Sequence, residues 1–90
     1  MHHFRGKLLD GGRVRLDPAN VYVLFHATAG GPDQGWYGYL LISSGGDVDP
    51  GGVYTLTLTD GRSGSLRVDQ VTPEDSVGFR ATFVGEGPLR

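Results

Sequence analysis

Polar and apolar residues alternate on both sides of a glycine-containing turn in residues 54–71, and no other feature of the chain constrains its fold as strongly. Successive side chains of a β-strand point to opposite faces of the sheet. One face of this segment would be apolar, with Leu56, Leu58, Leu66 and Val68, and the other would consist mainly of threonine, serine, arginine and aspartate. The pattern predicts a β-hairpin with one buried and one solvated face.

Short extended segments are expected along the rest of the chain as well. Sixteen glycines and five prolines interrupt the sequence. No segment keeps the i, i+3, i+4, i+7 apolar spacing of an amphipathic helix over three turns. We expect seven strands, at about residues 3–9, 13–16, 21–27, 36–42, 53–59, 65–71 and 78–84.

Residues that favour turns stand between several of these strands. The segments 10–12 (Asp-Gly-Gly) and 60–64 contain glycines that tolerate positive φ, and 17–20 (Asp-Pro-Ala-Asn) suits a tight turn. In 72–75 (Thr-Pro-Glu-Asp), threonine can cap a helix and proline is favoured at the first helical position. This last segment therefore predicts a single helical turn.

Short strands joined by short connections favour antiparallel neighbours, and closing the sheet on itself removes its exposed edges. We therefore expect one all-β domain spanning residues 1–90. Its architecture would be a small antiparallel β-barrel of six or seven short strands, with a two-sheet β-sandwich as the alternative. The expected core comprises Phe4, Leu8, Val14, Leu16, Val23, Phe25, Leu40, Leu56, Leu58, Leu66, Val68, Phe79 and Phe83.

The composition restricts the kinds of site that the chain can form. The absence of cysteine excludes a disulfide framework and thiolate chemistry. The three histidines, His2, His3 and His26, fall short of a zinc ligand set, so we expect no metal and no cofactor. No serine lies in a nucleophile-elbow motif, and no glycine-rich loop matches a nucleotide-binding motif. We expect a protein that acts by binding and is not an enzyme.

The expected location follows from the same composition. No apolar run reaches the ~18 to 20 residues that a membrane helix needs, and the first residues lack the apolar segment of a signal peptide. A chain without cysteine also suits a reducing compartment. We expect a soluble, cytoplasmic protein.

Two of the expected strands, 21–27 and 36–42, differ from the hairpin because both of their faces are apolar or aromatic. Such a strand is usually covered on both sides. The cover of the outer side would be another protein or a second copy of the chain, which would contact Tyr22, Leu24, Tyr37, Tyr39 and Leu41. The alternatives are the chain's own long connections at 28–35 and 43–52, or a glycan or nucleic-acid base stacked on the tyrosines.

Positive charge is concentrated at the start of the chain. Residues 1–17 contain four basic and two acidic residues and so carry +2, whereas the whole chain carries −2. A three-residue turn at 10–12 would pair Leu8 with Val14 and Lys7 with Arg15. The outer face of this hairpin would then be cationic and would display Arg5, Lys7, Arg13 and Arg15.

Two functions are consistent with these departures from simple alternation. The leading hypothesis is a module for protein interaction or self-association through the apolar and tyrosine-rich face. The alternative is an anion or nucleic-acid binder that uses the basic hairpin. A charged outer face that merely protects the sheet from aggregation would look the same in the sequence.

Overall fold

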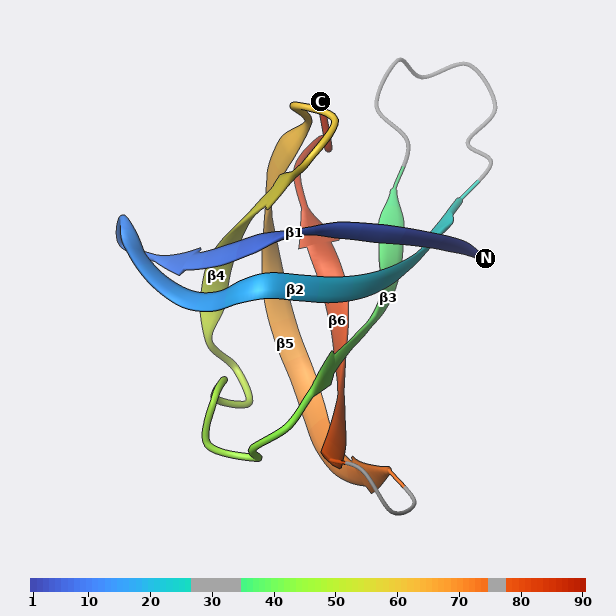
Figure 1. Ribbon diagram of the computed structural model, residues 1–90. Coiled ribbons are helices and arrows are strands. Elements are labelled where there is room, and N and C mark those ends of the chain that lie inside the picture. Colours follow the sequence, from blue (N-terminus) through green and yellow to red (C-terminus); the bar gives the residue numbers. More distant parts are fainter. Residues whose placement is uncertain (27–34, 75–77) are drawn as a thin grey trace.

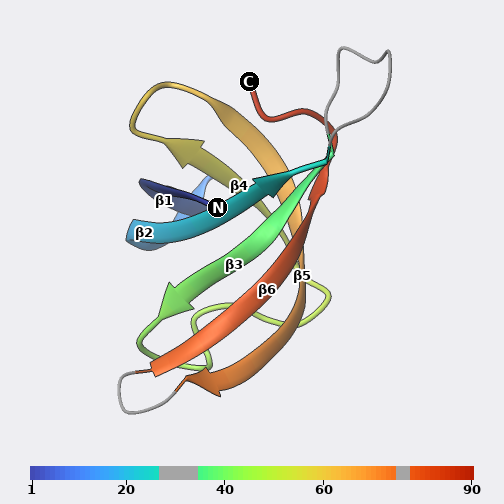
Figure 2. The same ribbon diagram turned by 90° about the vertical axis from the view of Figure 1, so that its right-hand side faces the viewer.

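The computed structural model describes residues 1–26, 35–74 and 78–90, and its regular secondary structure there is entirely β-strand. Six strands wrap around a single interior (Figure 1, Figure 2). Their bounds are β1 His2–Asp10, β2 Arg13–Phe25, β3 Trp36–Ile42, β4 Val53–Leu58, β5 Ser63–Glu74 and β6 Gly78–Glu86. None of the described residues belongs to a helix that could cross a membrane.

The strands form a closed barrel in the order β1-β2-β3-β6-β5-β4, and every neighbouring pair is antiparallel. The pairing of β1 with β4, from Gly6 opposite Leu58 to Leu9 opposite Thr55, closes the ring. The predicted small antiparallel barrel is therefore confirmed, with six strands.

The predicted turn at residues 17–20 is wrong, because β2 runs without interruption from Arg13 to Phe25. Ala19 pairs with Gly6 and Asn20 with Arg5 of β1. Pairing of β2 with β3 begins only at Asn20, so Pro18 lies where β2 has one neighbour. Proline is tolerated at such an edge, since no second ladder requires its missing N–H.

The helical turn predicted at 72–75 is also wrong for the part of this segment that the structure describes, residues 72–74. Thr72 and Pro73 continue β5 and pair with Arg80 and Phe79 of β6. Here too the proline occupies an edge, because β4 pairs with β5 only as far as Arg67. Pairing with a strand close in the chain outweighed the local helix-capping signal.

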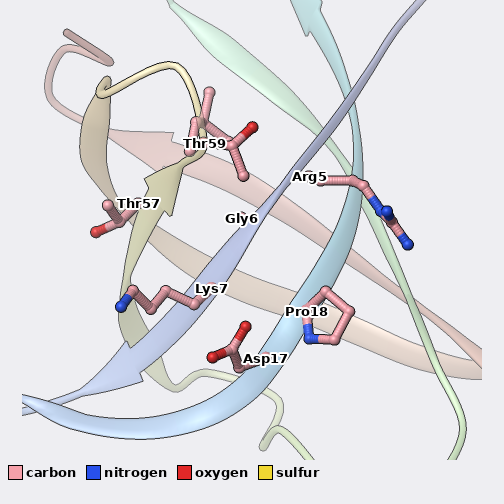
Figure 3. A pocket seen from close by; sticks show the side chains of 8 residues that line it. Arg5, Gly6, Lys7, Asp17, Pro18, Thr57 and Thr59 are labelled. Atoms are coloured by element: carbon pink, nitrogen blue, oxygen red, sulfur yellow. The ribbon is translucent and has the colours of Figure 1, made fainter.

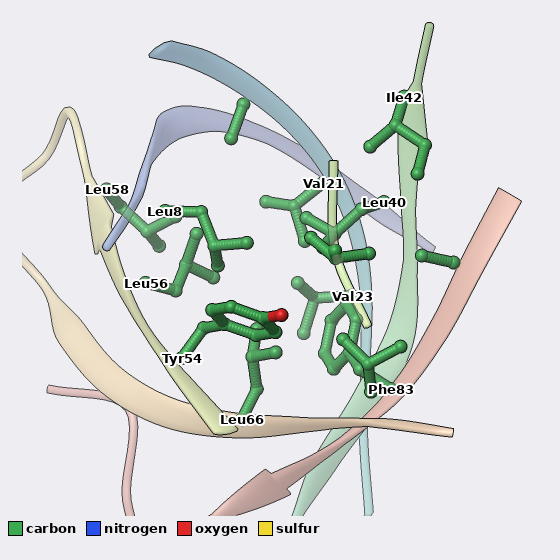
Figure 4. Packing of buried hydrophobic residues seen from close by; sticks show 14 of the residues in the cluster. Leu8, Val21, Val23, Leu40, Ile42, Tyr54, Leu56, Leu58, Leu66 and Phe83 are labelled. Carbon is green, nitrogen blue, oxygen red and sulfur yellow. The ribbon is translucent and has the colours of Figure 1, made fainter. Parts of the chain in front are cut away.

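The hydrophobic core receives side chains from all six strands (Figure 4). Most predicted core residues are buried, and Phe4, Leu16, Phe25 and Phe79 are partly buried against them. The prediction that Val14 belongs to the core is wrong, since Val14 is 55% exposed. The buried apolar residues are Leu8, Ala19, Val21, Val23, Trp36, Leu40, Ile42, Val48, Tyr54, Leu56, Leu58, Leu66, Val68, Ala81 and Phe83.

Trp36 is the largest side chain that is fully buried in this core. Its ring meets Phe83 edge-on at 5.6 Å between centroids, and its Nε1–H donates to the carbonyl oxygen of Gly87 at 2.8 Å. Gly85 leaves room for the indole, because a Cβ on Gly85 would lie 2.3 Å from Trp36 Nε1. Buried tryptophan usually requires such a partner for its N–H, and here the C-terminal segment supplies it.

Gly38 is required where the backbone of β2 leaves no room for a side chain on β3. It lies between Tyr37 and Tyr39 on β3, opposite Val23 on β2. A Cβ at this position would lie 1.8 Å from the carbonyl oxygen of Tyr22. Any side chain would therefore push β3 away from β2 and disturb the residues on the outer side of both strands.

We predict that Gly38→Ala lowers the free energy of unfolding by at least about 2 kcal/mol, because the added methyl group meets backbone that is held in the ladder. Gly46→Ala is the matched control, since a Cβ there meets nothing within 4 Å and Gly46 does not have a positive φ. Urea unfolding followed by the fluorescence of Trp36 measures both. Similar midpoints for the two variants would contradict the prediction.

Candidate binding surface

The outward side chains of β2, β3 and β6 form one continuous surface, which we call the outer face. Alternating residues of β3 point outward, while those between them are buried. Cross-strand pairing arranges the outer face in three rows, which are Leu24–Tyr37–Val84, Tyr22–Tyr39–Thr82 and Asn20–Leu41–Arg80. The structure thus brings together all five residues of the predicted interaction surface, Tyr22, Leu24, Tyr37, Tyr39 and Leu41.

A stack of planar groups crosses four strands on this face. The rings of His3 and Tyr22 are 4.6 Å apart and those of Tyr22 and Tyr39 are 4.9 Å apart, each pair nearly parallel. The guanidinium carbon of Arg80 lies 4.1 Å from the centre of the Tyr39 ring. The stack therefore runs from β1 through β2 and β3 to β6.

Stacking determines which parts of the tyrosines can contact a partner. Tyr22 is covered on one side by His3 and on the other by Tyr39, and Tyr39 lies between Tyr22 and Arg80. Tyr37 stacks on His26 at 4.5 Å. A further ring could not stack on Tyr22 or Tyr39 without displacing a neighbour, so these tyrosines present their edges and hydroxyl groups.

The arginines that border the outer face are already paired with carboxylates. Arg80 contacts both carboxylate oxygens of Glu74, at 2.8 Å from its Nε and 3.0 Å from its Nη2. Arg67, next to Val84 on the neighbouring strand, lies 2.9 Å from Glu86. These two ion pairs leave the outer face with little excess charge from its arginines.

Apolar surface remains accessible in the first and third rows of the face. Tyr37 is 36% exposed, Leu41 37% and Val84 45%, although all three lie on paired strands. Beside them, Tyr37, Tyr39, Val84 and Arg80 line an open depression of about 540 Å³ that extends to Met1 and Asp69. Tyr37 and Val84 thus form an exposed apolar patch beside the polar groups of the depression, a combination found in many protein interfaces, and Leu41 lies apart from it beyond the row of Tyr39.

β6 contributes one residue to each row of this face, as β2 and β3 do, but the predicted interaction surface included no residue of β6. Arg80, Thr82 and Val84 alternate with Phe79, Ala81 and Phe83, which point inward. That alternation is visible in the sequence. What is not visible there is that β6 lies beside β3, since the two strands are far apart in the chain.

The basic hairpin does not have the predicted register. Gly11 and Gly12 form a two-residue turn with φ of 56° and 88°, and Asp10 pairs with Arg13. Two consecutive positive φ values characterise the type I′ turn, for which Gly-Gly is a favoured sequence. Val14 consequently lies opposite Leu9, and Leu16 opposite Leu8.

The predicted pairing of Lys7 with Arg15 is wrong, and this register parts Arg15 from Lys7, while Arg5 and Lys7 line the same depression. Lys7 lies beside Thr57 of β4. Arg15 instead donates from Nε to the carbonyl oxygen of Asp47 at 3.1 Å and approaches the carboxylates of Asp10 and Asp49 at 3.6 Å and 3.9 Å. Arg5, Lys7, Arg13 and Arg15 therefore do not form the predicted cationic face.

Among the described residues, no three histidine, cysteine, aspartate or glutamate side chains gather in a way that could hold a metal ion. Comparison of the chain with protein-family models, with curated proteins and with solved structures found no match.

We predict that Tyr22 and Tyr39 stabilise the fold jointly. A double-mutant cycle with Tyr22→Leu and Tyr39→Leu should give a coupling free energy of about 0.5–1.5 kcal/mol, as expected for stacked aromatic rings. The control cycle pairs Tyr22→Leu with Tyr37→Leu, whose rings do not stack on each other, and should give a smaller value. Equal coupling in the two cycles, measured by urea unfolding, would refute the role of the stack.

Proposed function

We propose that the chain is a non-enzymatic binding module whose outer face contacts another protein or a second copy of the chain. The observation that carries this proposal is the position of Tyr37 and Val84, which pair across β3 and β6, remain exposed and line an open depression, with the exposed Leu41 on the same face. Contiguous exposed apolar surface rimmed by polar groups is typical of protein interaction sites. We further propose the cytoplasm as its location, since a chain without cysteine suits a reducing compartment.

A protein partner fits this surface better than a ligand that stacks on aromatic rings. The flat sides of Tyr22 and Tyr39 are occupied by their neighbours in the stack. Arg67 and Arg80 are paired with glutamates, so they offer little attraction to a polyanion. Tyrosine edges and hydroxyls next to apolar side chains are instead well suited to the mixed polar and apolar surface of another protein.

The connection at 43–52, one of the two that could cover this face, packs against the core and against Arg15 and Tyr54. The connection between β3 and β4 inserts Val48 into the core, and the backbone N–H of Asp49 donates to the Tyr54 hydroxyl at 2.8 Å. Asp47 accepts from Arg15 in the same region. The other connection, at 28–35, lies outside the described residues except for Gly35.

Site-specific photo-crosslinking tests the proposal in cells that express the chain. A photoreactive phenylalanine analogue in place of Tyr37 should form a discrete crosslinked species, whereas the same analogue in place of Thr55 should not. Thr55 is a matched control because it is exposed on β4, which lies opposite β3 in the ring of strands. Adding Val84→Asp to the Tyr37 probe should abolish the crosslink, because a carboxylate would be buried in an apolar contact.

The mass of the crosslinked species separates the two versions of the proposal. Twice the mass of the chain indicates self-association, and sedimentation velocity should then show a concentration-dependent dimer that Val84→Asp dissociates. A larger or smaller mass increment indicates a different protein. Equal crosslinking from positions 37 and 55, or a crosslink that survives Val84→Asp in a folded protein, would contradict the proposal.

A further inference from the structure

A second surface of the barrel gathers polar groups of a different kind. Where β1 passes between β2 and β4, an open depression of about 260 Å³ is lined by Arg5 and Lys7 of β1, Thr57 of β4 and the following Thr59, and Asp17 and Pro18 of β2 (Figure 3). Two cations and two hydroxyl groups thus surround one concave site. The site lies outside the three rows of the outer face.

The depression exists because β1 and β4 are in backbone contact at Gly6. A Cβ on Gly6 would lie 2.1 Å from the carbonyl oxygen of Thr57, so only glycine permits this approach. The same contact places Lys7 directly beside Thr57, and the N–H of Thr59 donates to the carbonyl oxygen of Arg5 at 2.9 Å. The two threonines and the two cations are therefore held together by the closure of the barrel.

The cations at this site differ from most others in the protein because no described carboxylate forms an ion pair with them. In contrast, the Arg62 side chain donates a hydrogen bond to Asp60, which lowers the pKa of that carboxyl group. Four arginines form ion pairs with carboxylates, namely Arg15 with Asp10, Arg62 with Asp60, Arg67 with Glu86 and Arg80 with Glu74. Arg5 and Lys7 retain their donors for a ligand.

Their side chains extend to the two sides of Gly6. Figure 3 shows the Lys7 ammonium on the side of Thr57 and the Arg5 guanidinium extending toward β2. Both side chains are exposed and have rotamer freedom, so a group seated over Gly6 can be reached from both sides. Among the described residues, Asp17 is the one carboxylate that lines the depression, and its charge opposes an anion there.

We propose that this depression binds a phosphate group, with Arg5 and Lys7 supplying the positive charge and the hydroxyls of Thr57 and Thr59 donating further hydrogen bonds. Lysine and arginine donors form short, charge-assisted bonds to phosphate oxygens, and hydroxyls complete the set around a tetrahedral anion. The ligand class is thus a phosphate, either free or carried on a larger molecule. This site is independent of the proposed protein contact, because none of the residues that line it belongs to the three rows of the outer face.

Inorganic phosphate is the first probe. In a titration followed by amide chemical shifts, with sodium chloride at equal ionic strength as reference, Gly6, Thr57 and Thr59 should shift to saturation. Lys7→Gln and Arg5→Gln should each weaken the apparent affinity about tenfold, the effect of losing one charge-assisted contact. Asp17→Asn should strengthen it, because the opposing charge is removed.

Arg13→Gln is the matched control, since Arg13 is also exposed and has no ion pair with a described carboxylate, but does not line the depression. It should leave phosphate binding unchanged. An oligothymidylate titrated in the same way identifies the source of the phosphate. If it binds much more tightly through the same residues, the ligand is a phosphodiester chain, and if it does not, the ligand is a small phosphate compound.

The proposal is overturned if the amide shifts do not saturate, if chloride reproduces them, or if Arg13→Gln weakens binding as much as Lys7→Gln. It is also overturned if Asp17→Asn weakens binding in a protein whose amide spectrum remains folded. None of these results bears on the outer face, because Tyr37 and Val84 do not line the phosphate site and its residues do not line the depression beside Tyr37. The two proposals can therefore fail separately.

Discussion

The four-residue ladder between β1 and β4 closes the barrel, and the rest of the structure depends on this closure. It requires the two backbones to meet at Gly6, where a side chain would collide with the Thr57 carbonyl oxygen. Once the ring is closed, inward residues of all six strands share one core, and the backbone groups in the ladders find partners. Closure also determines which residues face outward together on neighbouring strands.

Both candidate surfaces follow from this ring. On one side, β2, β3 and β6 place tyrosines and aliphatic side chains in adjacent rows, and the tyrosines stack on one another and on Arg80. On the other, β1 and β4 place two cations beside two threonines. The first surface has its arginines neutralised and exposes apolar groups, whereas the second keeps its positive charge available. They suit partners of opposite chemistry.

Local sequence signals failed where pairing between strands competed with them. The segments around Pro18 and Pro73 predict a turn and a helical turn, yet both continue strands, because each proline lies on an edge that lacks a second ladder. The prediction of the hairpin register was wrong for a different reason. The residues around Gly11-Gly12 can form either a two-residue or a three-residue connection. That one-residue difference exposed Val14 and moved Arg15 away from Lys7.

Alternation along the chain by itself determined the all-β class, the extent of most strands and which side of the strand at 53–58 faces the core. The lack of alternation in the strands at 21–27 and 36–42 indicated that Tyr22, Leu24, Tyr37, Tyr39 and Leu41 form an apolar surface on the outside of the barrel. Only the tertiary structure decided that β6 adds Arg80 and Val84 to that surface, and that Lys7 meets Thr57 and not Arg15. The period of a strand is a local property of the backbone, whereas the choice of its neighbours depends on how the whole ring closes.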